Sequence, residues 1–179
     1  MKTYIILLRG INVGGKNKIP MSDLKLCLME QGFKNVKTYI QSGNVILQSE
    51  LNEKAIKENI ESILPMSFKL DSEVKVLVLT PKQIQEIVDN KPKGFGEQPE
   101  KYRSDVIFLI EIDSALAITI FSPKEGVDKV WRGDGVIYFQ RLFSELTKSR
   151  LNKIIGTPVY KQMTIRNWNT TTKLKKILD

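Results

Sequence analysis

The chain has 179 residues, of which 41% are hydrophobic, so it can form one sizeable packed domain or two small ones and is not a disordered chain. It contains no histidine and a single cysteine, which excludes zinc sites, Ser-His-Asp triads and internal disulfides and favours a reducing cytoplasm. We expect neither a membrane span nor a signal peptide, because no apolar run approaches about 20 residues.

The net charge of +8 is concentrated near the C-terminus, where residues 141–179 carry nine Lys or Arg residues against two acidic ones. A basic segment of this kind favours attraction to phosphates, nucleic acid or an acidic partner. Without histidine, any catalysis has to use Lys, Arg, Tyr, Asp or Glu side chains, or Mg²⁺ held by carboxylates. We expect no resident metal or cofactor.

The first half of the chain predicts strands and helices in the order βαββαβ. Pro20 fits the first position of a helix that Gly32 ends, and Asn52 caps a second helix that Pro65 ends. The second and third strands form a hairpin around Gly43. This is the ferredoxin-like order. The predicted strands are residues 3–9, 36–41, 45–48 and 73–79.

A capping box from Thr80 to Gln83 predicts the start of a further helix. Residues 90–103 follow it without a hydrophobic period and contain several prolines and glycines. We therefore place a border here, with a ferredoxin-like subdomain and its linking helix at residues 1–90 and a second one with a basic C-terminal helix at 91–179.

The second half predicts a degenerate repeat of the same order. Its elements are a strand at 105–112, a short helix or strand at 115–118, a hairpin within 127–140 that turns at Gly133–Gly135, a helix at 144–155 and a strand at 158–162. Taken together, the pattern predicts an α+β protein with two ferredoxin-like subdomains and a C-terminal helix.

The tail, residues 164–179, ends in a helix that either Thr164 or Asn169 caps. Trp168 and Ile177 would fall on opposite sides of a continuous helix, which favours a strand-like IRNW segment before a later cap.

A glycine-rich, basic loop from Arg9 to Lys18 follows the first predicted strand, and its segment from Gly10 to Lys16 fits the G-x-x-x-x-G-K pattern of a nucleotide P-loop. However, Asn17 stands where Ser or Thr would hold Mg²⁺. Pro20 also puts the helix start several residues too late for its first amides to hold the phosphates.

An anion-binding loop, with backbone amides freed by the glycines, is the better interpretation. The alternative is structural: the glycines only allow a tight loop, the lysines are solvated and Asn12 caps a turn. The candidate ligand-binding residues are Arg9, Asn12, Gly14, Gly15, Lys16, Lys18, Arg166 and Asn167.

The tip of the first predicted hairpin offers a second candidate patch of neutral donors and acceptors, Gln41, Ser42 and Asn44. We expect this tip and the glycine-rich loop to lie at opposite ends of the sheet, so that they do not share a site. The alternative is that the tip only turns the hairpin.

Residues 164–170 are dense in planar and polar side chains that suit a phosphate, a carboxylate or a stacked base. The structural alternative makes Trp168 a core anchor. It makes Lys173, Lys175 and Lys176 a solvated helix face.

Three blocks, LRGINVGGKNKIPM, YIQSGNV and TIRNWNTTTKL, resemble the recurring pattern of the bacterial family called domain of unknown function 1697. The resemblance implies a bacterial cytoplasmic protein with two ferredoxin-like subdomains and no established activity. The family pattern marks, without assigning chemistry, Arg9, Gly10, Asn12, Gly14, Gly15, Ser42, Gly43, Asn44, Arg166, Asn167 and Trp168.

The leading hypothesis is a binding module in which the loop from Arg9 to Lys18, aided by Arg166 and Asn167, holds a phosphorylated small molecule or a nucleic-acid backbone. The ferredoxin-like order permits RNA binding, although neither hairpin strand shows the aromatic-rich pattern of RNA recognition modules. One alternative is an enzyme that acts on a phosphorylated metabolite or nucleotide, with Lys16 as electrostatic stabiliser. A protein interaction scaffold is the third.

Overall fold

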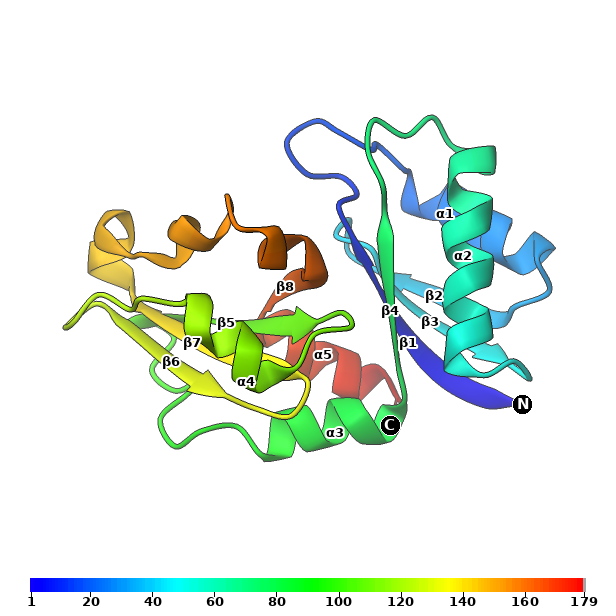
Figure 1. Ribbon diagram of the computed structural model, residues 1–179. Helices are drawn as coiled ribbons and strands as arrows, with labels where there is room; N and C mark the ends of the chain where they lie inside the picture. Colours follow the sequence, from blue (N-terminus) through cyan, green and yellow to red (C-terminus); the bar gives the residue numbers. More distant parts are fainter. Residues whose placement is uncertain (179) are drawn as a thin grey trace. The chain divides into compact units, whose positions relative to one another are not determined.

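The computed structural model describes residues 1–178, which pack as two compact units divided between Gln83 and Ile84. Each unit contains one four-stranded antiparallel sheet accompanied by helices (Figure 1). The protein is therefore α+β, as predicted. The border expected after residue 90 stays a prediction, and Asp179, the last residue of the expected tail helix, lies outside the described residues.

The first unit follows the predicted βαββαβ order, and its strands lie in the order β2-β3-β1-β4 with every pair antiparallel. Helices α1 and α2 cover one face of this sheet (Figure 1). The elements are β1 (Lys2–Arg9), α1 (Met21–Glu30), β2 (Lys34–Tyr39), β3 (Asn44–Ser49), α2 (Glu53–Ser67) and β4 (Lys75–Leu79).

The core of the first unit is aliphatic and lies between the sheet and its two helices. Alternate residues of β1, such as Ile6 and Leu8, point into it because successive strand side chains face opposite sides. Leu24 of α1 and Ile60 of α2 meet them at helical spacing, and both are fully buried. The hydrophobic period of the sequence thus places both helices on the same face.

Two helix starts confirm the prediction. Asn52 Oδ1 accepts the backbone N–H of Ala55 at 2.9 Å and caps α2. At the start of α3 (Pro81–Asp89), the N–H of Thr80 donates to Gln83 Oε1 at 2.8 Å, and the N–H of Gln83 donates to Thr80 Oγ1 at 3.3 Å. These reciprocal bonds are the predicted capping box.

The prediction that Pro65 ends α2 is wrong, because the helix continues to Ser67. Pro65 stands in the last turn, where its missing N–H removes a single hydrogen bond near a helix end. The N–H of Phe68 still donates to the carbonyl of Leu64 at 2.9 Å, so the backbone ladder resumes beyond the proline.

The second unit repeats the strand order, as β6-β7-β5-β8, with shorter helical elements. Its turn between β6 and β7 falls at residues 133–135, as predicted. The elements after α3 are β5 (Tyr102–Leu109), α4 (Ser114–Ala117), η1 (Ile118–Ile120), β6 (Asp128–Arg132), β7 (Val136–Leu142), η2 (Phe143–Lys148), η3 (Leu151–Ile154), η4 (Pro158–Gln162), β8 (Met163–Asn167) and α5 (Trp168–Leu178), where η denotes a 3₁₀ helix.

The helix predicted at 144–155 does not form, and two 3₁₀ segments take its place. The backbone leaves the helical region at Glu145, with φ −125° and ψ 23°. Asp128 Oδ2 then accepts the backbone N–H of Arg150 at 2.8 Å, and that of Lys124 at 2.9 Å. This buried carboxylate holds the chain in a path that a continuous helix would not follow.

The strand predicted at 158–162 is instead the 3₁₀ segment η4, and the fourth strand is β8. The strand-like run before the tail helix is confirmed for residues 165–167, which belong to β8, whereas Trp168 is already the first residue of α5. Neither Thr164 nor Asn169 caps α5, since Asn167 Oδ1 accepts the N–H of Thr170 at 2.8 Å. The strand and the cap therefore meet in one residue.

Helical elements cover both faces of the second sheet (Figure 1). One face packs on α4 and the 3₁₀ segments through an apolar cluster that includes Phe121 and Phe139. On the other face lie α3 and α5, joined by an ion pair of 2.6 Å between Lys175 Nζ and Asp89 Oδ1. The hydrogen bond from Lys175 lowers the pKa of Asp89 below its ordinary value. Within residues 1–178, no helix is both long and apolar enough to cross a membrane.

Candidate functional site

The glycine-rich loop and the hairpin tip between β2 and β3 meet at one end of the first sheet. Leu8 N–H donates to the carbonyl of Gly43 at 2.8 Å, and Asn12 Nδ2 donates to the carbonyl of Gln41 at 2.9 Å. The expectation that these segments lie at opposite ends is therefore wrong. β1 pairs antiparallel with β3, so the end of β1 lies beside the start of β3.

Gly43 allows this close contact between hairpin and loop. Its φ is +76°, and a Cβ atom at this position would lie 2.8 Å from Leu8 Cβ and 2.9 Å from Ile11 Cδ1. Both values are shorter than carbon atoms tolerate, so a larger residue would push the tip away from the loop. The glycine of YIQSGNV therefore joins the first two sequence blocks into one structure.

Asn12 closes the glycine-rich loop with its side chain. Asn12 Oδ1 accepts the N–H of Ile19 at 2.8 Å, and Nδ2 donates to the carbonyls of Ile19 and Gln41 at 2.9 Å each. The carboxamide thus imitates a strand partner for Ile19 and uses both of its N–H donors inside the protein. This geometry matches the structural alternative, in which Asn12 fixes a turn.

Asn17 ties the same loop to the segment before β4. It is fully buried, and its Nδ2 donates to the carbonyls of Gly10 and Ser72 at 2.8 and 3.0 Å. Its Oδ1 accepts the backbone N–H of Asp71 at 2.6 Å, and its own N–H donates to Asp71 Oδ2 at 2.9 Å. A Ser or Thr could not make this set of bonds, which gives the departure from the P-loop pattern a structural reason.

The two central glycines form the tip of the loop. Lys16 N–H donates to the carbonyl of Val13 at 3.0 Å, and between them Gly14 and Gly15 have φ values of +59° and +77°. Two left-handed residues in succession make a tight turn of the hairpin type. Residues 13–16 are all exposed, and the predicted binding role of this segment stays a prediction.

Folding of the loop brings the start of α1 beside the hairpin tip. An open pocket of about 540 Å³ lies at this junction. Among the described residues it has no acidic lining, and it offers the Lys18 ammonium group, the Ser22 hydroxyl and the Gln41 carboxamide. Asp23 and Leu24 make the first helical bonds, to the carbonyl of Pro20, and Pro20 provides no side-chain cap. The amides that precede these two point out of the helix end.

The sequence did not indicate Ser22 and the start of α1 as site residues, because several residues separate them from the glycines along the chain. Pro20 was the available signal, but its position after the glycines counted against an anion at the first helical amides. In the fold, the turn at residues 13–16 and the bonds between Asn12 and Ile19 remove that separation.

Two of the three hairpin residues have structural partners. Asn44 is fully buried, and its Nδ2 donates to the carbonyl of Tyr39 at 3.1 Å and to Ser42 Oγ at 2.9 Å. Gln41, by contrast, is exposed and lines the pocket beside Lys18. Of the second candidate patch, Gln41 is therefore the side chain that faces the junction.

Arg166 and Asn167 lie in the second unit. Arg166 is only 6% exposed, and its Nη1 donates to Thr164 Oγ1 at 2.8 Å and to the carbonyl of Ile165 at 2.9 Å. Burial lowers the pKa of Arg166 to about 10, so the guanidinium group keeps its charge at neutral pH. Asn167 caps α5. A shared role of these two residues with the glycine-rich loop stays a prediction.

Comparison with known proteins bears on the blocks that form this junction. A family model described as "Protein of unknown function (DUF1697)" matches residues 1–138, which include the glycine-rich loop and the hairpin tip. The chain belongs to the DUF1697 family. The third block, residues 164–174, lies beyond the part that the DUF1697 model matches.

A solved structure is similar to this DUF1697 chain over almost its whole length. It is the conserved bacterial protein SP0830 from Streptococcus pneumoniae, with 27% sequence identity and a TM-score of 0.82 over 99% of this chain and 98% of that chain. No curated protein matches the chain. The resemblance to the family is confirmed, and membership of DUF1697 brings no activity with it.

Proposed function

We propose that this DUF1697 chain is a binding protein whose first unit holds a phosphate-bearing ligand, either a small molecule or a nucleic-acid backbone, in the pocket beside Lys18, Ser22 and Gln41. One observation carries the proposal: a cationic side chain, a neutral carboxamide and the uncapped start of α1 converge on one open pocket. The Lys18 ammonium group and the helix N-terminus, which carries about half a positive charge, attract an anion, and the Gln41 carboxamide can donate hydrogen bonds to it.

The loop lines the pocket through Asn12 and Lys18 and supports it through its other residues. Asn12, Asn17 and Gly43 fix the backbone around the junction through bonds that need no ligand. A site held in place before binding loses less conformational freedom when the ligand arrives. Arg9, Lys16 and the glycines at positions 14 and 15 do not line the pocket, and in this proposal the charge of Lys16 attracts the anion at longer range.

The sheet topology supports the finer description of the fold. Both units have the antiparallel order in which the first strand lies between the third and the fourth. This is the order expected of a ferredoxin-like subdomain, a fold that RNA recognition modules share, and fold analogy alone assigns no ligand. We also keep a bacterial cytoplasm as the setting proposed for the protein.

Asp23 is the acidic group that works against the proposed ligand. It lies in the first turn of α1, where its carboxylate already interacts favourably with the helix end, and Ser22 Oγ donates to its Oδ1 at 3.0 Å. An incoming phosphate would compete with this carboxylate. Asp23→Asn should therefore tighten binding several-fold, an effect that a purely structural role for Asp23 would not produce.

The test is a thermal-shift and calorimetric titration of the full chain with inorganic phosphate, sugar phosphates, nucleotides and short RNAs. Lys18→Gln should weaken the best of these ligands about tenfold, as expected for loss of one charge-assisted hydrogen bond. Lys25→Gln removes the same charge from an exposed position further along α1 and should leave affinity unchanged. If no probe shifts the wild type, or if Lys25→Gln weakens binding as much as Lys18→Gln does, the proposal fails.

A further inference from the structure

The second unit contains a cleft of about 320 Å³ that the proposed function does not use. The beginning of β5, the beginning of η2 and the junction of β8 with α5 form its walls. Its lining includes aromatic, cationic and amide side chains, namely Tyr102, Arg103, Phe143, Asn167 and Trp168.

Trp168 forms a rigid wall of the cleft. Its ring stands edge-on to the fully buried ring of Phe95, with centroids 5.2 Å apart and planes at 78°. The backbone of Gly96 lies against the indole, and a Cβ atom there would be 2.3 Å from Trp168 Nε1. The half-buried indole is thus fixed in position while part of it remains accessible.

Phe143 and Tyr102 supply further aromatic surface. Phe143 is 55% exposed at the cleft, so its ring is accessible to a ligand. The ammonium groups of Lys101 and Lys129 lie 5.2 and 5.3 Å from the centre of the Tyr102 ring. Aromatic surface and positive charge therefore occur together.

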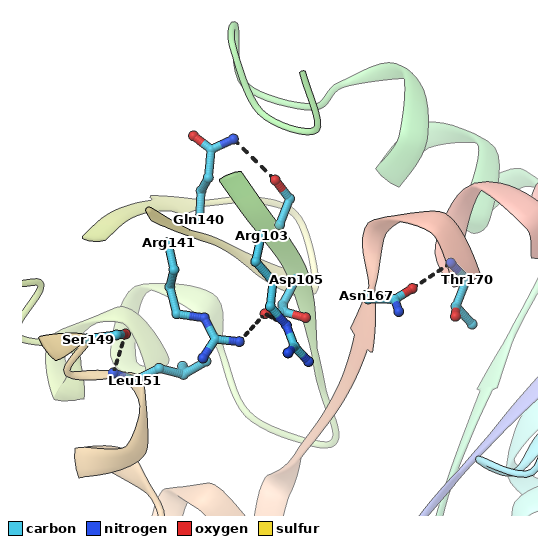
Figure 2. Close-up of polar contacts among 9 residues, drawn as sticks. Arg103, Asp105, Gln140, Arg141, Ser149, Leu151, Asn167 and Thr170 are labelled. Carbon is cyan, nitrogen blue, oxygen red and sulfur yellow. Dashed lines mark hydrogen bonds and ion pairs between the residues drawn. The ribbon is translucent and has the colours of Figure 1, made fainter. Parts of the chain in front are cut away.

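The carboxylate beside Arg103 does not cancel the positive charge of the cleft. Asp105 Oδ2 accepts Arg141 Nη2 at 2.7 Å and lies 3.7 Å from Arg103 Nε, so that two guanidinium groups share one buried carboxylate (Figure 2). The Arg103 side chain is 51% exposed, compared with 13% for Arg141. Arg103 is therefore the cation that can turn towards a ligand in the cleft.

The pairing of β5 with β8 stops before the cleft. β8 ends at Asn167, which lies opposite Asp105, so residues 102–104 extend past the end of that strand. On their other side these residues pair with β7. The N–H of Tyr102 already donates to the carbonyl of Gln98 at 3.0 Å, so ligand recognition at this end of β5 rests on the side chains.

We propose that this cleft binds a nucleotide unit, with the base stacked on Phe143 and Trp168 and the phosphate on Arg103. A nucleotide combines the two properties that the cleft addresses, an aromatic ring and a negative charge next to it. The unit comes either from a free nucleotide or from a single-stranded nucleic acid. This proposal concerns the second unit alone and does not depend on the pocket beside Lys18.

The experiment measures how strongly the full chain prefers a base. Fluorescence anisotropy compares a labelled single-stranded RNA with an abasic strand of the same length, and mononucleotides compete with both. The wild type should bind the base-bearing strand about tenfold more tightly, as stacking on aromatic side chains predicts. Phe143→Ala should reduce this preference to about one.

Matched variants separate stacking and charge from general effects. Leu116→Ala removes a similarly exposed apolar side chain from α4 and should keep the base preference. Arg103→Gln should weaken both strands and reduce the salt dependence by about one phosphate contact, whereas Lys161→Gln, at an exposed position of η4, should not. Lys18→Gln, which tests the pocket of the first unit, should also leave the base preference intact.

Each outcome of the competition bears on the proposal. Mononucleotides that compete as well as RNA support a free nucleotide as the ligand, and mononucleotides that compete poorly against a base-preferring wild type support a single-stranded nucleic acid. Equal affinity for the base-bearing and abasic strands overturns the proposal. Loss of base preference in Leu116→Ala to the same extent as in Phe143→Ala overturns it too.

Discussion

The two units share a strand order and differ in the helices that cover it. Both sheets place their first strand between the third and the fourth, as β2-β3-β1-β4 and as β6-β7-β5-β8. In the first unit, two helices of 10 and 15 residues connect the strands. In the second, α4 has only 4 residues, and 3₁₀ segments replace the second helix. Strand pairing therefore keeps the same topology while the helical layer changes.

The second unit uses a buried carboxylate where its helical segments are short and an aromatic cluster on the face that α3 and α5 cover. Asp128 holds Lys124 and Arg150 through their backbone amides. On the opposite face, Phe95 stands edge-on to Trp131 and Tyr138, with centroids 6.0 and 5.0 Å away. The first unit uses such buried polar contacts in its glycine-rich loop instead, where Asn17 and Asn12 make them. Where the helical segments are short, a buried carboxylate therefore fixes the backbone beside the apolar cluster.

The largest expected effect concerns the aromatic cluster. Phe95→Ala should lower the free energy of unfolding of the second unit by about 3–5 kcal/mol, because it empties a fully buried site and removes the contacts with its aromatic neighbours. Both tryptophans of the chain, Trp131 and Trp168, lie in this unit. Tryptophan fluorescence during urea unfolding therefore reports the loss directly.

Phe33→Ala is the matched control for this variant. Phe33 is a buried residue of the first core, so its removal should have a similar cost there and should appear in far-UV circular dichroism. A tryptophan transition that shifts less in Phe95→Ala than in Phe33→Ala would contradict the role assigned to the cluster.

The next effect concerns the carboxylate that replaces a helix. Asp128→Ala should cost about 2–4 kcal/mol, since it leaves two backbone donors without their acceptor in a site where Asp128 itself is only 7% exposed. Urea unfolding followed by tryptophan fluorescence measures this cost. Asp128→Asn retains one carbonyl oxygen and should recover part of the loss. If Asp128→Ala unfolds at the wild-type urea concentration, the carboxylate does not hold the 3₁₀ segments.

The sequence allowed prediction of features that depend on neighbouring residues. Asn52, the Thr80 to Gln83 capping box and the strand positions of the first unit all follow from patterns within a few residues, and the fold confirms them. The failures involve partners far apart in the chain. Asp128 determines the path of residues 149–151, and the spacing of Leu151 and Ile154 alone imitates a continuous helix.

The same limit applies to the candidate site. Sequence patterns found the glycine-rich loop and the hairpin tip, and the structure shows that they meet. The two segments lie at the same end of the sheet because β1 and β3 are antiparallel. The predicted strand order already implied this arrangement, so the expectation of opposite ends was an error of geometry. The roles of Asn12 and Asn17 lay beyond local patterns, because Asn12 bonds Gln41 and Asn17 bonds Asp71 across the fold.

A smaller effect appears at alkaline pH in the second unit. Tyr138 Oη donates to the carbonyl of Ile87 at 2.6 Å, and burial raises the pKa of Tyr138 to about 12. The unfolded chain loses this proton near pH 10, so the contribution of Tyr138 to stability is complete below about pH 10 and is lost as the pH rises towards 12. The loss should be on the order of 1–2 kcal/mol, allowing for partial screening by solvent.

Urea midpoints measured from pH 8 to pH 11.5 test this expectation. Tyr138→Phe should cost about 1 kcal/mol at neutral pH, where it removes the hydrogen bond, and should flatten the decline above pH 10. An equally steep decline in Tyr138→Phe and the wild type would show that other groups cause it.

The smallest effect completes the comparison between the units. Asn52→Ala removes the cap of α2 and should cost about 1 kcal/mol, less than Asp128→Ala, although both side chains accept a backbone amide at a similar distance. The difference arises from exposure, because water can replace the Asn52 oxygen at an exposed helix start and cannot do so at the buried Asp128. Circular dichroism during urea unfolding measures this cost, with the exposed Ser62→Ala in the same helix expected within about 0.5 kcal/mol of the wild type. Equal costs at Asn52 and Asp128 would mean that burial does not determine how much these contacts contribute to the free energy of unfolding. The inference that a buried carboxylate takes the place of helix packing would then lose its physical basis.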